Sequence, residues 1–153
     1  MKKVMFVCLG NICRSPMAEA IFRHLVKEAG KEAEYFIDSS GTSAYHIGEE
    51  SDPRMQMTAE KHGVEMCHLG QEFEKKHFAE FDLIVAMDQS NFNNIIRLTQ
   101  NDKDRQKVKL MRDYDQQNES LAVPDPYYGG KDGFEEVFRI LEKSCKGLLK
   151  QTE

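Results

Sequence analysis

The feature that most constrains the fold is the apolar run from Val4 to Leu9, which passes within a few residues into a helical pattern. The run contains no glycine, proline or charge and predicts a buried strand. Pro16 suits the first turn of a helix, and Ser15 is a residue type that often caps one. Apolar residues then recur at helical spacing, at Ala18, Ile21, Phe22 and Leu25.

The same alternation of short apolar runs and helical patterns continues along the chain. Further strands are predicted over Phe36–Ser39, Phe81–Met87 and Val108–Met111, and helices over Asn91–Leu98 and Phe134–Leu148. Strands separated by helices predict an α/β fold: a four-stranded parallel sheet with helices on both faces. No internal repeat or linker-like stretch divides the chain, so we expect a single domain over residues 1–153.

The composition of the chain argues against nucleic acids and membranes as binding partners. The net charge of −5 argues against a nucleic-acid backbone as the main ligand, although a local phosphate site stays compatible with it. The first apolar run is too short for a signal segment or a membrane span. The four cysteines are then expected to be reduced thiols in a cytoplasmic protein that binds neither nucleic acid nor membrane.

Residues able to carry chemistry gather directly after the first strand. Cys8 is followed by five residues and then by Arg14 and Ser15. A backbone that curls between a strand and a helix can point several N–H groups at an anion, and the helix N-terminus adds partial positive charge. Gly10 and Asn11 are expected to supply the unusual torsions. Arg14 offers a planar fork for two phosphate oxygens, so the loop predicts a phosphate site.

Cys8 is the candidate nucleophile of this loop. A cysteine at the end of a strand is by itself most often a packing residue, but the spacing to Arg14 and Ser15 favours catalysis. The helix terminus and Arg14 both favour the thiolate. Attack of the thiolate on phosphorus gives a cysteinyl-phosphate. Ser15 is placed to donate a hydrogen bond to the sulfur, which helps it to leave in the second step.

The segment from Val7 to Pro16 (VCLGNICRSP) resembles the signature of the low-molecular-weight protein tyrosine phosphatases. Three further segments resemble parts of that family in the same order: Asp38–Ser43, Ala86–Asp88 and Asp125–Gly129. The resemblance covers nearly the whole chain. It implies the flavodoxin-like phosphatase I fold and chemistry without a cofactor or a metal.

The resemblance also implies roles for matching positions. Cys8 is the implied nucleophile, Arg14 binds phosphate and stabilises the charge of the transition state, and Asp125 is the general acid and then the general base. Ser39 and His68 are implied to support the loop. The remaining implied phosphate and substrate contacts are Leu9, Gly10, Asn11, Ile12, Cys13, Ser15, Tyr45, Tyr127 and Tyr128.

These roles predict hydrolysis of phosphotyrosyl proteins or small aryl phosphates, with inorganic phosphate as product. His46, directly after Tyr45, lies in a stretch that varies among relatives, which leaves the substrate preference open. Tyr127 and Tyr128 match tyrosines that are phosphorylated in some relatives, and exposed tyrosines there are compatible with a monomer or with weak self-association. Cys13 is either a small buried residue or a thiol that forms a reversible disulfide with oxidised Cys8.

Three other functions stay open. Arsenate reduction needs further cysteines that relay a disulfide, and Cys67 and Cys145 do not form the close downstream pair expected. Protein arginine phosphatases of bacteria carry a threonine where this chain has Ile12, which favours phosphotyrosine. A phosphate-binding module without turnover is the third, but such a relative would usually have lost one of the three catalytic residues, all of which are present.

Other candidate residues have plainer interpretations. His62, Cys67 and His68 are close in sequence, but their spacing matches no strong zinc pattern, so we expect no metal site. Cys145 falls on the apolar stripe of the last helix and is predicted to lie in the core. His77 is predicted to lie at the surface.

Overall fold

The computed structural model describes residues 1–115, 122–126 and 132–153. It contains a four-stranded sheet in the order β2-β1-β3-β4, in which all neighbouring strands are parallel. The strands are β1 (Lys2–Cys8), β2 (Tyr35–Gly41), β3 (Leu83–Ala86) and β4 (Val108–Leu110). The predicted α/β fold with a parallel sheet is therefore confirmed.

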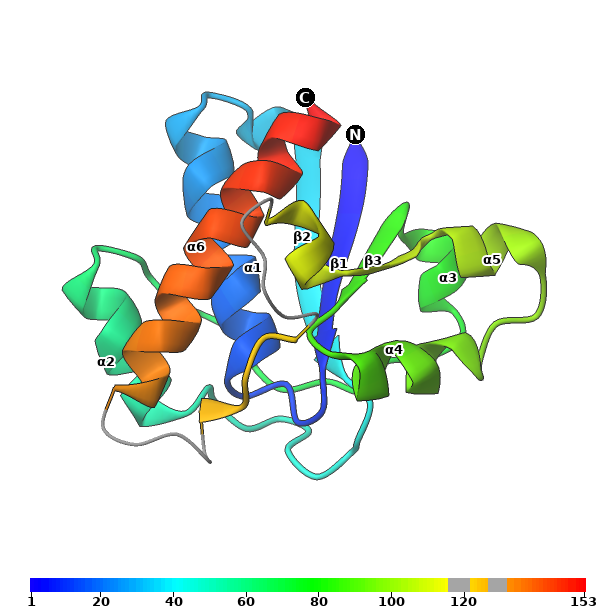
Figure 1. Cartoon of the computed structure of the whole chain (residues 1–153), viewed down its shortest axis with the longest axis horizontal. Helices are drawn as coiled ribbons and strands as arrows, with labels where there is room; N and C mark the ends of the chain where they lie inside the picture. Colours follow the sequence, from blue (N-terminus) through cyan, green and yellow to red (C-terminus); the bar gives the residue numbers. More distant parts are fainter. Residues whose placement is uncertain (116–121, 127–131) are drawn as a thin grey trace.

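Helices cover both faces of this sheet, with α1 and α6 on one side and α3, α4 and α5 toward the other (Figure 1). The α-helices are α1 (Arg14–Glu28), α2 (Pro53–Lys61), α3 (His77–Glu80), α4 (Gln89–Ile96), α5 (Asp102–Gln106) and α6 (Gly133–Thr152). Two short 3-10 helices are η1 (Glu32–Glu34) and η2 (Met111–Tyr114). In the described part of the chain, no helix is both long and apolar enough to cross a membrane.

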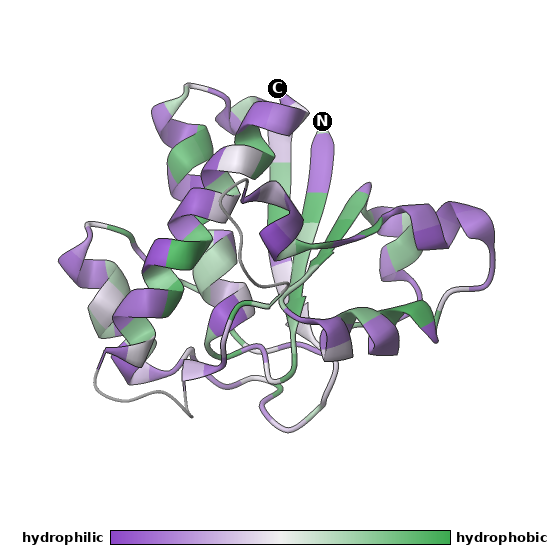
Figure 2. Ribbon diagram, viewed as in Figure 1, coloured by the Kyte–Doolittle hydropathy of each residue, from purple (hydrophilic) through white to green (hydrophobic). Residues whose placement is uncertain are grey.

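The core consists of two hydrophobic clusters, one on each face of the sheet. Successive residues of a strand point to opposite faces, so β1 contributes to both. Val4 and Phe6 belong to the cluster beneath α1 and α6, whereas Met5 and Val7 belong to the cluster beneath α3 and α4. Figure 2 shows the same arrangement, with hydrophobic strands at the centre and hydrophilic residues on the outer faces of the helices.

The carboxyl ends of three strands meet at one edge of the sheet. Cys8 pairs with Gly41 at the ends of β1 and β2, and Val7 pairs with Ala86 at the end of β3. Gly41 allows β2 to end against the first loop, because a Cβ there would lie 2.7 Å from the carbonyl oxygen of Leu9. Ligands bind at this edge in open α/β sheets.

Two local predictions are wrong. Ser15 does not cap α1: the helix begins at Arg14 after Cys13, and the Ser15 hydroxyl lies 2.9 Å from the sulfur of Cys8 instead. His77 is buried rather than exposed, and its ring lies beside Phe73. Its Nδ1 accepts a hydrogen bond from the backbone N–H of Glu74, and burial lowers its pKa.

Candidate active site

The loop from Cys8 to Ser15 joins β1 to α1 and places a backbone N–H and a hydroxyl beside the sulfur of Cys8. The backbone N–H of Asn11 points at the sulfur over 3.3 Å, and the Ser15 hydroxyl lies 2.9 Å from it. The side chain of Cys8 is buried at the base of this loop. The sulfur of Cys8 is therefore held within hydrogen-bond distance of two polar groups.

The predicted unusual torsion falls on Asn11 and not on Gly10. Asn11 has a φ of 58° and is the one non-glycine residue in the left-handed region among the described residues. Gly10 lies close to a neighbouring side chain: a Cβ there would lie 3.1 Å from the Cδ2 atom of His46. The loop is thus shaped by one left-handed residue and by one close approach.

The side-chain amide of Asn11 connects the loop to two other segments. Its nitrogen donates to the hydroxyls of Ser15 over 2.8 Å and Ser39 over 3.1 Å. Its oxygen accepts from the backbone N–H of Gln71 over 2.9 Å and lies 2.7 Å from Nε2 of His68. The backbone N–H of Gln71 can only donate, so the amide atom that it faces is the oxygen, and Nε2 of His68, which faces the same oxygen, is a donor.

The other nitrogen of His68 faces negative charge. Nδ1 lies 3.0 Å from the carboxylate of the buried Glu19 and 3.7 Å from that of Asp38. Ser39 donates to the same Glu19 oxygen over 2.7 Å, and the other oxygen pairs with Arg23 over 2.9 Å. Each ring nitrogen of His68 thus faces an oxygen that can accept a hydrogen bond.

Arg14 lies in the first turn of α1 with its side chain almost fully buried. Its Nη1 donates to the Asp88 carboxylate over 2.7 Å and to the carbonyl of Val123 over 3.1 Å. Burial works against its charge, but the negative charges of Cys8, Asp88 and Asp125 outweigh that effect and raise its pKa above the ordinary value. A permanent positive charge therefore lies beside Cys8.

The segment 122–126 runs past the end of β3 and brings Asp125 to this site. The backbone N–H of Val123 donates to the carbonyl of Met87 over 2.8 Å, and its own carbonyl accepts from Arg14. Asp125 follows two residues later, half-buried, with its carboxylate within electrostatic range of Arg14. Residues more than 100 positions apart, Cys8 and Asp125, are thereby placed at one site.

Two apolar side chains stand exposed at the outer edge of the loop. Leu9 is 50% exposed and Tyr45 is 86% exposed. The segment of Tyr45 is attached to the loop because the backbone N–H of Ser43 donates to the Leu9 carbonyl over 3.0 Å. Ile12 and Cys13 are buried, so only their backbone can face a ligand. Tyr127 and Tyr128 lie outside the described residues.

A family model described as low molecular weight phosphotyrosine protein phosphatase matches residues 3–153. The chain belongs to this family. Its relatives include a low molecular weight protein-tyrosine-phosphatase of Streptomyces coelicolor, 45% identical over 149 residues, which cover 96% of this chain and 91% of the relative. The family is a hydrolase family, as the resemblance in the sequence implies.

Solved structures agree with this membership in the phosphatase family. A protein tyrosine phosphatase from Entamoeba histolytica, with Hepes in its active site, superposes with a TM-score of 0.95 at 36% identity, over 99% of this chain and 97% of that one. A Drosophila arginine phosphatase superposes with a TM-score of 0.92 at 33% identity, over 100% and 98% of the two chains. The fold is therefore that of the low molecular weight phosphatases.

Three further polar residues lie at this site of the phosphatase and were not predicted from the sequence. Glu19 lies on the buried face of α1, Asp88 follows β3, and Gln71 lies on the segment after His68. Asp88 also caps α4, since its carboxylate accepts from the backbone N–H of Asn91 over 2.8 Å. The sequence carries a signal for Glu19 alone, which is a charged residue among the apolar positions of the helical pattern.

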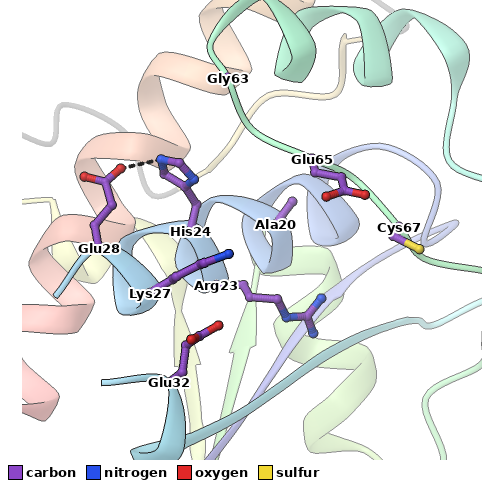
Figure 3. Close-up of a pocket in the computed structure, with 9 residues that line it drawn as sticks. All are labelled: Ala20, Arg23, His24, Lys27, Glu28, Glu32, Gly63, Glu65 and Cys67. Atoms are coloured by element: carbon purple, nitrogen blue, oxygen red, sulfur yellow. Dashed lines mark ion pairs between the residues drawn. The ribbon is translucent and has the colours of Figure 1, made fainter. Parts of the chain in front are cut away.

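Two other features of the phosphatase lie near or beside this site. Among the described residues, Glu19, Asp38 and His68 alone have potential metal-ligating atoms within 4.8 Å of one another, and hydrogen bonds already engage those atoms. A cavity of about 670 Å³ lies beside α1 and is lined by Arg23 and Lys27 of that helix and by Glu65 of the segment after α2 (Figure 3). Its described lining residues all lie outside the loop that holds Cys8.

Proposed function

We propose that this chain is a protein tyrosine phosphatase that hydrolyses phosphotyrosine through a cysteinyl-phosphate on Cys8. One observation carries the proposal: the buried sulfur of Cys8 faces the N–H of Asn11 and the hydroxyl of Ser15, with the Arg14 cation in the same loop. A thiolate and an anion-binding loop are thereby combined at the N-terminus of a helix. The catalytic unit is one domain over residues 1–153.

In the first step, the Cys8 thiolate attacks phosphorus and the bond between phosphorus and the tyrosine oxygen breaks. The charge that develops on the phosphoryl oxygens is met by the backbone N–H groups from Leu9 to Ser15 and by the planar guanidinium of Arg14. Asp125 donates its proton to the leaving phenolate oxygen. The products are a free tyrosine hydroxyl and a cysteinyl-phosphate.

In the second step, the same carboxylate accepts a proton from water as the water oxygen attacks phosphorus. The bond between sulfur and phosphorus breaks, and inorganic phosphate leaves. Ser15 stabilises the departing thiolate through its hydroxyl, which lies 2.9 Å from the sulfur. Ser39 and His68 act through Asn11, which they hold in the shape that points its N–H at Cys8.

Substrates of this proposed enzyme are phosphotyrosyl proteins and small aryl phosphates. Leu9 and Tyr45 are exposed beside the phosphate loop and form apolar walls for a flat ring, and Tyr127 and Tyr128 are proposed to extend those walls. We propose that the enzyme is a monomer or associates only weakly, because these walls would then stay accessible to a protein substrate. The exposed free thiol of Cys67 suits a reducing compartment, so we place the enzyme in the cytoplasm.

The test is hydrolysis of p-nitrophenyl phosphate and of a phosphotyrosyl peptide with EDTA present, for wild type, Cys8→Ser and the matched control Cys67→Ser. Turnover that survives EDTA, is retained by Cys67→Ser and is lost in Cys8→Ser supports the mechanism. Wild-type protein that is folded and reduced but binds phosphotyrosine without releasing phosphate is a binding module. Turnover that persists in Cys8→Ser contradicts the nucleophile.

A second candidate is hydrolysis of phosphoarginine, which the likeness to the Drosophila arginine phosphatase favours. Ile12 argues for phosphotyrosine, because its bulky side chain lies in the loop where bacterial arginine phosphatases have threonine. A comparison of kcat/KM for phosphotyrosyl and phosphoarginyl peptides of the same sequence decides between them. A higher value for phosphoarginine would replace the first candidate.

A further inference from the structure

Large exposed apolar side chains are concentrated around the phosphate loop. Of the seven such residues in the described part of the chain, four lie on the loop or on the two segments that border it. We call these four the apolar rim: Leu9, Tyr45, Ile47 and Leu69, exposed by 50%, 86%, 58% and 59%. Exposed apolar surface that is contiguous marks interaction sites, whereas single exposed apolar residues are ordinary.

Backbone hydrogen bonds hold the rim together. Gly48 donates to the carbonyl of Gly70 over 2.8 Å, and Gly70 donates to the carbonyl of Glu49 over 2.8 Å. Leu69 pairs with Glu50 in an antiparallel bridge. Ile47 and Leu69 therefore lie on two joined segments. The first of these segments contacts the phosphate loop near Gly10, and the second continues from His68, the partner of Asn11.

The charges on these two segments are acidic. Residues 42–50 and 69–72 contain three glutamates, at positions 49, 50 and 72, and no lysine or arginine. One of them, Glu49, contacts the ring of His46. A substrate segment that carries further carboxylates would meet like charge here, whereas an apolar segment would not.

We propose that Ile47 and Leu69 form a docking surface for a bulky apolar side chain next to the phosphotyrosine of a protein substrate. This inference rests on the proposed function. Leu9 in the phosphate loop and Tyr45 beside it are the proposed walls for the phosphotyrosine ring, which leaves Ile47 and Leu69 for the neighbouring residues of the substrate. An extended peptide advances about 3.3 Å per residue, so residues adjacent to the phosphotyrosine stay within reach of segments joined to the loop.

The experiment compares three phosphotyrosyl peptides that differ only in the flanking residues, which are leucine, alanine or glutamate. The wild type is expected to show the highest kcat/KM for the leucine peptide and the lowest for the glutamate peptide. Ile47→Ser combined with Leu69→Ser is expected to lower kcat/KM for the leucine peptide about tenfold, because partial burial of two such side chains is lost. The matched control is Met57→Ser, which removes a side chain 61% exposed on α2 and is expected to change nothing.

Each result has a distinct meaning. Equal kcat/KM for the three peptides in the wild type overturns the proposal. An equal loss for p-nitrophenyl phosphate and for the leucine peptide in the double variant also overturns it, because the side chains would then support the loop. A dimer in sedimentation that the double variant abolishes, without a peptide preference, makes the rim a contact between copies. Failure of the proposed function looks different: the wild type then turns over no phosphotyrosyl substrate at all.

Discussion

Nε2 of His68 donates a hydrogen bond to the amide oxygen of Asn11 over 2.7 Å. The amide oxygen also accepts from the backbone N–H of Gln71, which fixes the orientation of the amide and leaves its nitrogen to donate to Ser15 and Ser39. Asn11 itself holds a left-handed φ of 58°. The shape of the phosphate loop therefore depends on side chains from segments that are far apart in the sequence.

The left-handed backbone of Asn11 predicts that Asn11→Ala is less stable than Asn11→Gly. Both variants lose the hydrogen bonds of the amide, and both are expected to lose turnover. Only alanine must also hold a left-handed torsion, which costs it about 1 kcal/mol relative to glycine. Urea denaturation of the two variants measures the difference. Equal midpoints would show that the loop relaxes to another torsion without the amide.

Asp125→Ala is expected to lower turnover of phosphotyrosine by about 10²- to 10⁴-fold, the range of general acid catalysis. The loss should be largest for substrates whose leaving group needs a proton most. Asp132→Ala is the matched control, since Asp132 is exposed and makes no capping hydrogen bond at the start of α6. Steady-state kinetics with a series of aryl phosphates checks this. Full turnover by Asp125→Ala on a poor leaving group would remove Asp125 from the mechanism.

Asp88 has two roles that two substitutions can separate. Asp88→Ala removes both the partner of the buried Arg14 and the cap of α4, and is expected to destabilise the fold by about 3 kcal/mol. Asp88→Asn retains an oxygen for the cap and is expected to be more stable than the alanine variant by about 1 kcal/mol. Chemical denaturation measures both. Two equally stable variants would mean that the cap contributes nothing.

Because the imidazole of His77 is buried, we expect the protein to lose stability in mild acid. Burial lowers its folded-state pKa, and Phe73 and Phe81 lie against its ring. The unfolded chain binds a proton near pH 6.5 while the folded chain does not, so its contribution to stability is complete above that pH and falls below it. The slope is at most about 1.4 kcal/mol per pH unit.

The measurement is the urea midpoint of wild type and His77→Gln between pH 7.5 and pH 5. The wild type is expected to lose more stability than the variant over this range. Carboxylates titrate in both proteins and cancel in the difference. His24→Gln serves as the control, because His24 is part-exposed and pairs with Glu28 on α1. Parallel curves for wild type and His77→Gln would exclude the buried imidazole as the cause.

Because Cys13 lies in the same loop as Cys8, we expect the enzyme to be inactivated reversibly by peroxide. Oxidation of the Cys8 thiolate gives a sulfenic acid, and attack by the Cys13 thiol on that sulfur forms a disulfide and releases water. Without Cys13, excess peroxide oxidises the sulfenic acid further to sulfinic acid, which thiols do not reduce. Thiol reductant is then expected to restore activity to the wild type and to Cys67→Ser, but not to Cys13→Ser. Activity assays after peroxide and dithiothreitol test this. Equal recovery in all three proteins would show that Cys13 has no protective role.

The strand and loop that hold Cys8 could be predicted because their signals are local. An unbroken apolar run identifies β1, and Pro16 places the start of a helix close after Cys8. The short helices escaped prediction for physical reasons. α5 buries none of its residues and so shows no apolar period, and α3 has only four residues. The prediction that Ser15 caps α1 was wrong because a serine near the start of a helix is normally a cap, whereas this hydroxyl lies against the sulfur of Cys8.

The supporting side chains could not be predicted from pattern alone. Glu19 on α1, Gln71 on the segment after His68 and Asp88 after β3 are far apart in the sequence. They reach the site only in the folded chain. The resemblance implied that His68 and Ser39 support the loop; both contact Asn11, and their supporting role stays a prediction. The roles of Tyr127 and Tyr128 stay predictions, since both lie outside the described residues.

The ion pair between Arg23 and Glu19 has a consequence for how this surface tolerates change. The Arg23 side chain is 48% exposed, yet it holds the carboxylate that holds His68, which in turn positions Asn11. Solvent-facing helix positions usually accept almost any polar residue with little effect. Position 23 is expected to be an exception, because four side chains, those of Arg23, Glu19, His68 and Asn11, connect the outside of α1 to the sulfur of Cys8. Exposure alone would class a substitution there as neutral, whereas the contacts predict an effect on the phosphate loop.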